Sequence, residues 1–491
     1  MGVIQYYQVE ETIPMKPKVI KRFYEPMVLF KALTLGMLAT ATHSDLEENW
    51  DLKDPKQLFE AFVNKLSYVC DNEKGDGGAT ITSFVVLQLG GIGPIQYVFA
   101  CNKQSDIRLQ ATEGFVKQLL ELIGSDTRRK LLLHHVLWNN RKRIRLLFQD
   151  LVEETLECLT RCSDDLEFAK RESVQGLLHE MIRMLPDNGQ ISTDDKTEYL
   201  SGCDRLMKAL DKFEQQSTAS ETITQMSKDI RKRGHNSSND CWPEMLHAVK
   251  RILAYQSSIE IFKKTHAAFP ELFQRFEVFF LPSSTPLPKS EICREKSYQA
   301  EGIVNRMTRK VEYHEKFKQL VNDLQVFDLD ERIRVEYEKN SFRPIVHSEA
   351  HLHGWLGNTG GFSKWRFFRG WRYIGSSKPT CKLCHYYFQE HGSGVGHRIC
   401  HSNLYPCWRL PDVPVSAGTT GERDRQVIYD RIIERVRRDA FDIIGKKAAP
   451  RYRMHDSNTF SARMTFVYDP STTVSDLDDV SSLLGDLDIN E

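Results

Sequence analysis

The sequence predicts an α/β protein in which a three-layer α/β/α domain carries a large, mainly helical N-terminal region or insertion. Three observations predict this class. Two runs rich in β-branched and apolar residues flank a Gly-Pro turn at Gly93-Pro94. Apolar residues recur at helical spacing over most of residues 105–330. From Phe342 onward the composition changes to aromatic residues, Gly, His and Cys, where we expect strands and short helices.

The bulk composition is that of a folded protein with more than one unit. At 491 residues the chain is too long for one ordinary domain. Apolar residues make up 40% of it and charged residues 27%, which is ordinary for a protein with a sizeable core. The 67 Lys and Arg residues balance 67 Asp and Glu residues. A surface for nucleic acid would therefore have to be a local basic patch.

Cysteine usage and the N-terminal residues indicate a reducing compartment. Eleven cysteines stand at mostly wide spacings, and Met1–Tyr24 has no signal-peptide pattern. We therefore expect reduced thiols in an intracellular protein, cytoplasmic or nuclear. The apolar stretch Met27–Thr42 is short and is interrupted by Lys31, which predicts a buried helix and no association with a membrane.

The first half of the chain reads mainly as helices around one hairpin. Asp54 followed by Pro55 predicts a helix start, because Asp caps an N-terminus and Pro suits the first turn. Two buried strands are predicted over residues 81–89 and 95–102. We further expect one long or two broken helices over 131–156, helices over 165–184, 197–213 and 244–264, a loop over Gln215–Asn239, and a connector over Leu281–Lys289.

In the second half, the predicted order is strand, helix, strand, helix. A strand ends at Val346, a helix begins at His347, a strand covers 371–374, and a helix begins at Cys381. After these we expect a loop over 415–423, a helix over 426–444 and an acidic disordered tail. The predicted organisation is residues 1–104, a helical region or insertion over 105–335, a domain over 336–450 and the tail over 470–491.

Two motifs carry the chemistry, His347-x-Glu349 and Pro379-x-Cys381-x-x-Cys384. A catalytic zinc keeps three protein ligands and leaves a fourth position for water, which one imidazole and two thiolates satisfy. Cys381 and Cys384 lie one helical turn apart, so a helix that begins at Cys381 directs both sulfurs at one metal. Its N-terminus also favours their thiolate forms. The predicted ligands of a Zn²⁺ cofactor are therefore His347, Cys381 and Cys384.

Glu349 is the predicted catalytic residue. Two positions after His347, its carboxylate would lie beside the water whose pKa the zinc lowers. The same group would take a proton from that water as a base and later deliver protons as an acid.

On these motifs the chain resembles the cytidine deaminase-like superfamily, whose signature is His-x-Glu followed by Pro-Cys-x-x-Cys. It is most similar to a poorly characterised branch of nucleotide or nucleic-acid deaminases, widespread in fungal genomes and related to bacterial toxin deaminases. The resemblance covers residues 342–411, including the Tyr-Pro-Cys-Trp-Arg-Leu-Pro run at 405–411. It implies hydrolytic removal of an exocyclic amine from a nucleobase in a nucleoside, nucleotide or nucleic acid. The extra residue between Pro379 and Cys381 departs from the signature.

The resemblance also implies a fold and a substrate site. In that branch an early strand pair precedes a long helical region, so the hairpin over 80–102 would supply the first strands of a deaminase sheet. An Asn after the second strand faces the substrate in many members, and Asn102 matches it here. Pro379 belongs to the loop that packs against the base.

A basic and aromatic segment, residues 364–372, lies between the two motifs. Trp365, Arg369 and Trp371 could bind substrate there, since arginines attract phosphates and aromatic rings stack on bases. The alternative is an ordinary strand with an aromatic core face and a solvated basic face.

Other roles for the zinc motifs stay open. A closed structural zinc would take a further ligand from His397, Cys400, His401 or Cys407. His351 could compete with His347 as a ligand, but a polar helix face is the favoured interpretation of both His351 and His353. The alternatives to an enzyme are a non-catalytic zinc-stabilised interaction module and an inactive deaminase-like scaffold whose helical region binds protein partners.

Overall fold

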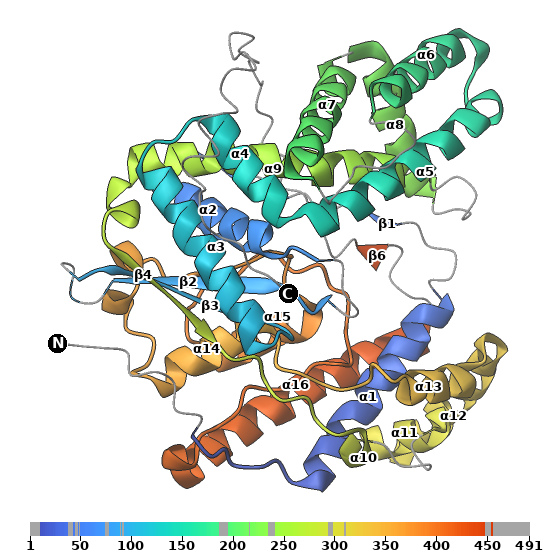
Figure 1. Cartoon of the computed structure of the whole chain (residues 1–491). Coiled ribbons are helices and arrows are strands. Elements are labelled where there is room, and N and C mark those ends of the chain that lie inside the picture. Colours follow the sequence, from blue (N-terminus) through green and yellow to red (C-terminus); the bar gives the residue numbers. More distant parts are fainter. Residues whose placement is uncertain are drawn as a thin grey trace.

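The computed structural model describes most of the chain between residues 10 and 454. The described residues are 10–37, 43–44, 48, 50–73, 78–88, 90, 93–185, 195–215, 217–233, 241–292, 298–308, 311–446 and 453–454. They form a mixed α/β structure, mostly helical, around a small four-stranded sheet (Figure 1). The predicted acidic tail lies outside the described residues.

The sheet has the order β4-β3-β2-β5. Strands β2 (Thr82–Gln88) and β3 (Ile95–Cys101) pair antiparallel from Thr82↔Cys101 to Gln88↔Ile95, which confirms the predicted hairpin. Strand β4 (Phe276–Leu281) pairs parallel with β3, and β5 (Ile374–Ser376) pairs antiparallel with β2. The sheet is therefore assembled from segments far apart in the sequence.

Side chains of β2 and β3 alternate between two apolar clusters, as the two-residue period of a strand requires. Phe84 and Phe99 belong to a first cluster with residues of α2 (Pro55–Cys70), α3 (Asp106–Gly124) and α9 (Cys241–Ala268). Val85 and Val98 belong to a second cluster with residues of α1 (Pro17–Met37), α14 (Ser348–Asn358) and α16 (Gly418–Lys446). Helices therefore pack on both faces of the sheet.

Two early helices match their sequence signals. Asp54 caps α2, and its Oδ1 accepts a hydrogen bond of 2.9 Å from the Lys56 backbone N–H. Helix α2 packs closely on β5 at Gly375, where an added Cβ would lie 2.8 Å from the Val63 carbonyl carbon. Helix α1 contains the first part of the apolar stretch and is buried in the second cluster. Within the described segments, no helix combines the length and hydropathy needed to cross a bilayer.

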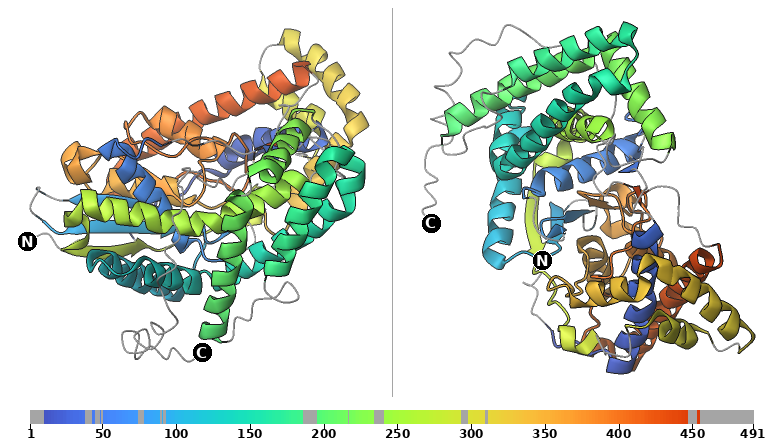
Figure 2. Two further views of the ribbon diagram at one scale, coloured as in Figure 1. Left: turned by 90° about the horizontal axis from the view of Figure 1, so that it is seen from above. Right: turned by 90° about the vertical axis from the view of Figure 1, so that its right-hand side faces the viewer.

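The helices before β4 follow the predicted pattern with one exception. Two helices, not one, cover the stretch 131–156. The loop predicted over Gln215–Asn239 is wrong, because α8 occupies most of it. Only a narrow stripe of α8, including Ala219, Ile223 and Ser227, is buried, so its sequence reads as polar. The helices that follow α3 and precede α9 can be traced in Figures 1 and 2. They are α4 (Arg129–Asn139), α5 (Arg141–Asp165), α6 (Phe168–Met184), α7 (Lys196–Gln215) and α8 (Ser217–Arg233).

The remaining helices surround α1 and α16. Residues 282–288 form the predicted connector. The loop predicted over 415–423 is wrong beyond residue 417, because α16 begins at Gly418. Figure 1 shows this group below the sheet: α10 (Lys289–Ile292), α11 (Ala300–Met307), α12 (Val311–Asp323) and α13 (Leu329–Glu338), with α15 (Lys382–His391) nearer the sheet.

Two further differences concern strands. The predicted strand over 371–374 lies at 374–376 as β5. The alternative of an ordinary strand over 364–372 is wrong: the segment contains two short 3₁₀ helices, and Arg369 and Gly370 both have positive φ, which turns the chain.

Candidate metal centre

The two motifs occupy the N-termini of two neighbouring helices. His347 is the N-cap of α14, and Cys381 is the N-cap of α15. Strand β5 lies between them in the chain, so the predicted order of helix, strand and helix is confirmed. Helix α14 contacts both β2 and α15, which brings the two helix starts together.

Two short β-bridges hold the residues that lead into these helices. Ile345 bridges Trp408 in parallel, with hydrogen bonds from Ile345 N to Cys407 O at 3.0 Å and from Arg409 N to Ile345 O at 2.9 Å. Thr380 bridges Cys400 in the same way. Both motifs are thus aligned by the segment that follows α15.

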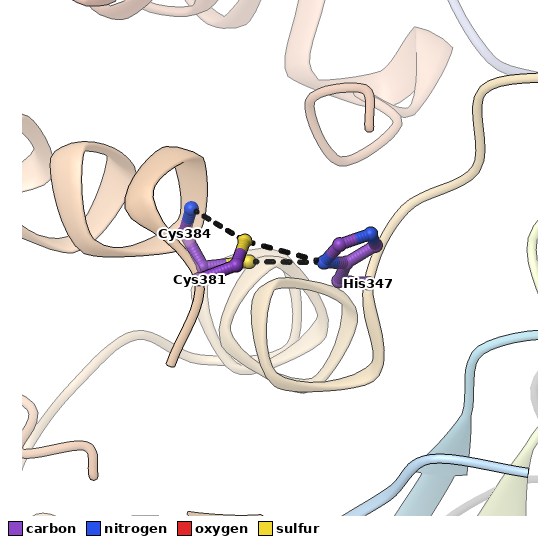
Figure 3. Close-up of side chains that lie close together, drawn as sticks. All are labelled: His347, Cys381 and Cys384. Carbon is purple, nitrogen blue, oxygen red and sulfur yellow. Dashed lines mark hydrogen bonds between the residues drawn. The ribbon is translucent and has the colours of Figure 1, made fainter. Parts of the chain in front are cut away.

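The three predicted ligands converge (Figure 3). His347 Nδ1 lies 3.5 Å from Cys381 Sγ and 3.6 Å from Cys384 Sγ. A nitrogen and a sulfur bound to one tetrahedral zinc lie ~3.6 Å apart, given the usual Zn–N and Zn–S bond lengths. The observed spacing is therefore the one that a shared zinc requires, and the donor set of one imidazole and two thiols suits that ion.

Within the described part of the chain, the possible metal-ligand atoms that gather at this site belong to three residues, His347, Cys381 and Cys384. These atoms all lie within 4.8 Å of one another. The other candidate ligands hydrogen-bond elsewhere. Cys400 Sγ accepts from Ser402 N, and Cys407 Sγ donates to Ser341 O, each at 3.3 Å. His397 Nδ1 forms a hydrogen bond of 2.7 Å with Arg398 O. His401 Nδ1 accepts a hydrogen bond of 3.0 Å from Asn403 N.

The other two histidines of α14 point away from the thiols. His351 Nε2 hydrogen-bonds with Pro282 O at 3.0 Å. His353 is fully buried and hydrogen-bonds with Tyr387 Oη and Ser393 Oγ, each at 2.8 Å. His353 therefore belongs to the core and not to a solvated polar face.

Glu349 lies beside the three ligands. It is buried, and its Oε2 accepts a hydrogen bond of 3.4 Å from Thr380 Oγ1. Burial, reinforced by the neighbouring Cys381, raises the pKa of Glu349 to about 7. The carboxyl group is thus held at the cluster by the residue that directly precedes Cys381.

Besides its contact with His347 Nδ1, each sulfur accepts a hydrogen bond from another N–H group. Cys381 Sγ accepts from Cys384 N at 3.4 Å, as a cap at the start of α15. Cys384 Sγ accepts from Trp408 Nε1 at 3.1 Å. Burial opposes ionisation of Cys381, but a side-chain hydrogen bond with Cys384 and the neighbouring His347 outweigh it and lower the pKa of the Cys381 thiol. Sequence reasoning assigned no role to Thr380, the extra residue of the second motif, or to Trp408, in the run over 405–411, because no local pattern shows what their side chains contact.

The residues predicted to bind substrate fall into two groups. Asn102 and Pro379 are buried near the cluster, since Asn102 contacts Ser348, the residue after His347, and Pro379 precedes Thr380. Arg369 instead pairs with Glu271 at 2.6 Å and lies over the Phe269 ring.

Trp371 packs against Phe59, with ring centroids 5.3 Å apart, in the first apolar cluster on the opposite side of the sheet from the thiols. The side chain of Trp365 lies outside the described residues.

A comparison with known protein families gives a match for one part of this region. Residues 346–412 match the family described as OTT_1508_deam-like deaminase. The matched residues contain both motifs and Trp408, so the match supports a deaminase family for this segment. No curated protein matches the chain, and no solved structure does.

Proposed function

We propose that this protein is a zinc-dependent hydrolytic deaminase that removes an exocyclic amine from a nucleobase. The observation that carries the proposal is the convergence of His347 Nδ1 and the thiols of Cys381 and Cys384 at zinc-ligand spacing, with the Glu349 carboxyl group beside them. The deaminase family match over the same residues supports it.

His347, Cys381 and Cys384 would hold the ion, which when bound supplies an activated water at neutral pH. Glu349 would take up one proton of this water and pass it to the ring nitrogen, and then carry the second proton, from the newly added hydroxyl, to the amine, which leaves as ammonia. Thr380 keeps the carboxyl group in position through its hydrogen bond to Oε2. The buried surroundings exclude bulk water from the proton transfer.

The fold proposal rests on β2 and β5. Their antiparallel pairing, from Ser83↔Ser376 to Val85↔Ile374, joins the early hairpin to the matched segment. We propose that residues 80–102 supply the first strands of a three-layer cytidine deaminase-like domain and that residues 105–335 are a helical insertion. Helices on both sheet faces support this arrangement.

The substrate and its location are part of the proposal. We propose a nucleoside, nucleotide or nucleic acid as substrate, in the cytoplasm or nucleus, where both thiols stay reduced. Three further points stay predictions. One is that the helical region binds protein partners, and another is that the chain is related to the fungal branch and to toxin deaminases. The third is a substrate role for Asn102, Pro379, Trp365, Arg369 and Trp371.

Ammonia release by a Glu349→Gln variant tests the proposal. The probes are cytidine, adenosine, their monophosphates, and single-stranded DNA and RNA containing C or A. We expect wild type to release ammonia from at least one probe and the variant to be slower by about 10²–10⁴-fold at equal zinc content. Glu336→Gln is the matched control, because Glu336 is also buried but lies on α13 and pairs with Lys339. Zinc-loaded wild type that releases no ammonia from any probe would contradict the proposal.

A non-catalytic, zinc-stabilised interaction module is the second candidate. The nearly complete burial of Glu349 and of both thiols favours it, because a structural site needs no access for substrate. In that case Glu349→Gln and wild type would share zinc content and stability, and neither would release ammonia.

A further inference from the structure

Trp408 contacts the metal centre from outside the two motifs. Its side chain is fully buried in the second apolar cluster, and its indole N–H donates to Cys384 Sγ at 3.1 Å. A buried indole N–H needs an acceptor, and here the acceptor is a sulfur of the cluster. Because an indole N–H can only donate, Trp408 is the donor of this hydrogen bond and the Cys384 sulfur is its acceptor.

The contact completes a pattern at the two sulfurs. Cys381 Sγ receives the backbone N–H of Cys384, whereas Cys384 Sγ, one turn inside α15, receives the indole N–H. An N–H donor withdraws electron density from a thiolate, so it weakens the charge that the sulfur donates to a metal. Without Trp408, this hydrogen bond to Cys384 would be lost while that to Cys381 remained.

Trp408 also lies in the segment that holds the residues before His347. It stands opposite Ile345, two residues ahead of the imidazole ligand, and its neighbours Cys407 and Arg409 make the two hydrogen bonds of this bridge. Its own carbonyl oxygen accepts a hydrogen bond of 3.0 Å from Tyr24 Oη on α1. Trp408 thus touches a thiol ligand through its side chain and is anchored beside the histidine ligand by its neighbours.

We propose that Trp408 is a positioning residue of the metal centre: its indole N–H lowers the charge that Cys384 donates, and it also holds the Cys384 sulfur in the ligand position, which raises the affinity for zinc. This inference rests on the proposed function only in requiring that His347, Cys381 and Cys384 bind the metal. The competing explanation is that the indole merely fills space between α1 and α15. Under the proposal, the metal centre needs the indole N–H group itself. Under the competing explanation, it needs only the volume of the ring.

Cobalt spectroscopy of the full chain separates these explanations. Replacing Trp408 by 3-benzothienylalanine keeps the shape of the ring but puts sulfur where the N–H is, and Trp408→Phe removes the donor together with part of the ring. In the Co²⁺-loaded protein we expect both changes to shift the sulfur-to-cobalt charge-transfer band to lower energy. Zinc affinity, measured by competition with a chromophoric chelator, should fall about tenfold.

Trp242→Phe is the matched control, because Trp242 is equally buried but donates its indole N–H to Asp165 at 2.8 Å, away from the thiols. It should leave the band and the affinity unchanged. A benzothienyl variant with the wild-type band and wild-type zinc affinity would overturn the proposal, whatever the stability of Trp408→Phe.

Cys384→Ser distinguishes this failure from failure of the proposed function. If Cys384→Ser alters the cobalt band and the benzothienyl variant does not, only the role of Trp408 is wrong. If Cys384→Ser also leaves the band and the metal content unchanged, Cys384 is not a ligand, and the metal centre on which both proposals depend is wrong.

Discussion

Asn102 Oδ1 accepts a hydrogen bond of 2.8 Å from the backbone N–H of Ser348, so the end of the early hairpin caps the helix that begins after His347. The first N–H groups of a helix have no partner inside the helix. Asn102 supplies one, and its own Nδ2 donates to Gly78 O at 3.2 Å. The position of His347 and Glu349 therefore depends on a residue outside both motifs.

Asn102→Ala should destabilise the fold and weaken metal binding. The change leaves the buried Ser348 N–H without its acceptor, which costs ~1–3 kcal/mol. Urea unfolding and zinc content after dialysis measure the two effects. Asn358→Ala, at the exposed C-terminal end of the same helix, is the control and should behave as wild type. Equal stability of Asn102→Ala and the control would contradict this role.

Zinc content should depend on the three converging residues and not on their neighbours. His347→Ala and Cys381→Ser should each lose most of the zinc after dialysis, because two protein ligands hold the ion poorly. Cys400→Ser and His397→Gln should keep about one zinc per chain by elemental analysis, the content that we also expect of wild type. A loss of zinc in either of these two controls would instead indicate a closed site with a further protein ligand.

The buried ion pair between Asp71 and Arg143 should dominate acid sensitivity in the first apolar cluster. The charged atoms lie 2.5 Å apart, and Thr80 Oγ1 also donates to Asp71 at 2.6 Å. Burial alone would raise the pKa of Asp71, but Arg143, helped by Lys378 and the Thr80 hydrogen bond, outweighs it and the pKa falls below its usual value. The carboxylate therefore stabilises the fold above the unfolded-state pKa, and this contribution is lost as the pH falls through the folded-state pKa.

Asp71→Asn leaves Arg143 buried without a charged partner, which should cost ~3–5 kcal/mol at pH 7. The difference from wild type should shrink as the pH falls below about 4, because the unfolded wild-type chain then binds a proton at Asp71 that the folded protein takes up only at lower pH. Urea unfolding at a series of pH values measures this, with the exposed pair of Asp126 as the control site, where Asp126→Asn should have little effect. A difference that stays constant from pH 7 to pH 3 would sink the prediction.

Much of the candidate site was accessible from the sequence because its signals are local. The His-x-Glu and Cys-x-x-Cys spacings each place their side chains at one helix start, and both helices begin where predicted. The hairpin was equally accessible, since two apolar runs flank a short turn.

What sequence reasoning missed depends on contacts between distant segments. Strand β4 is a short aromatic run whose stability comes from its parallel pairing with β3. The contacts of Trp408 with Cys384 and of Asn102 with Ser348 join residues that no periodicity relates. The sequence of α8 predicts a loop, because so few residues of this helix are buried and apolar.

The pairing of β5 with β2 has a consequence for how the chain is made. When β2 and β3 leave the ribosome, the strand that covers the open edge of β2 has not yet been translated, and it arrives only after the whole of residues 105–335. Until then the nascent hairpin exposes an unpaired apolar edge, which is a template for aggregation. Recombinant production should therefore benefit from slow translation or abundant chaperones, and residues 336–450 expressed alone should yield little folded protein, because β2, β3 and β4 would be missing.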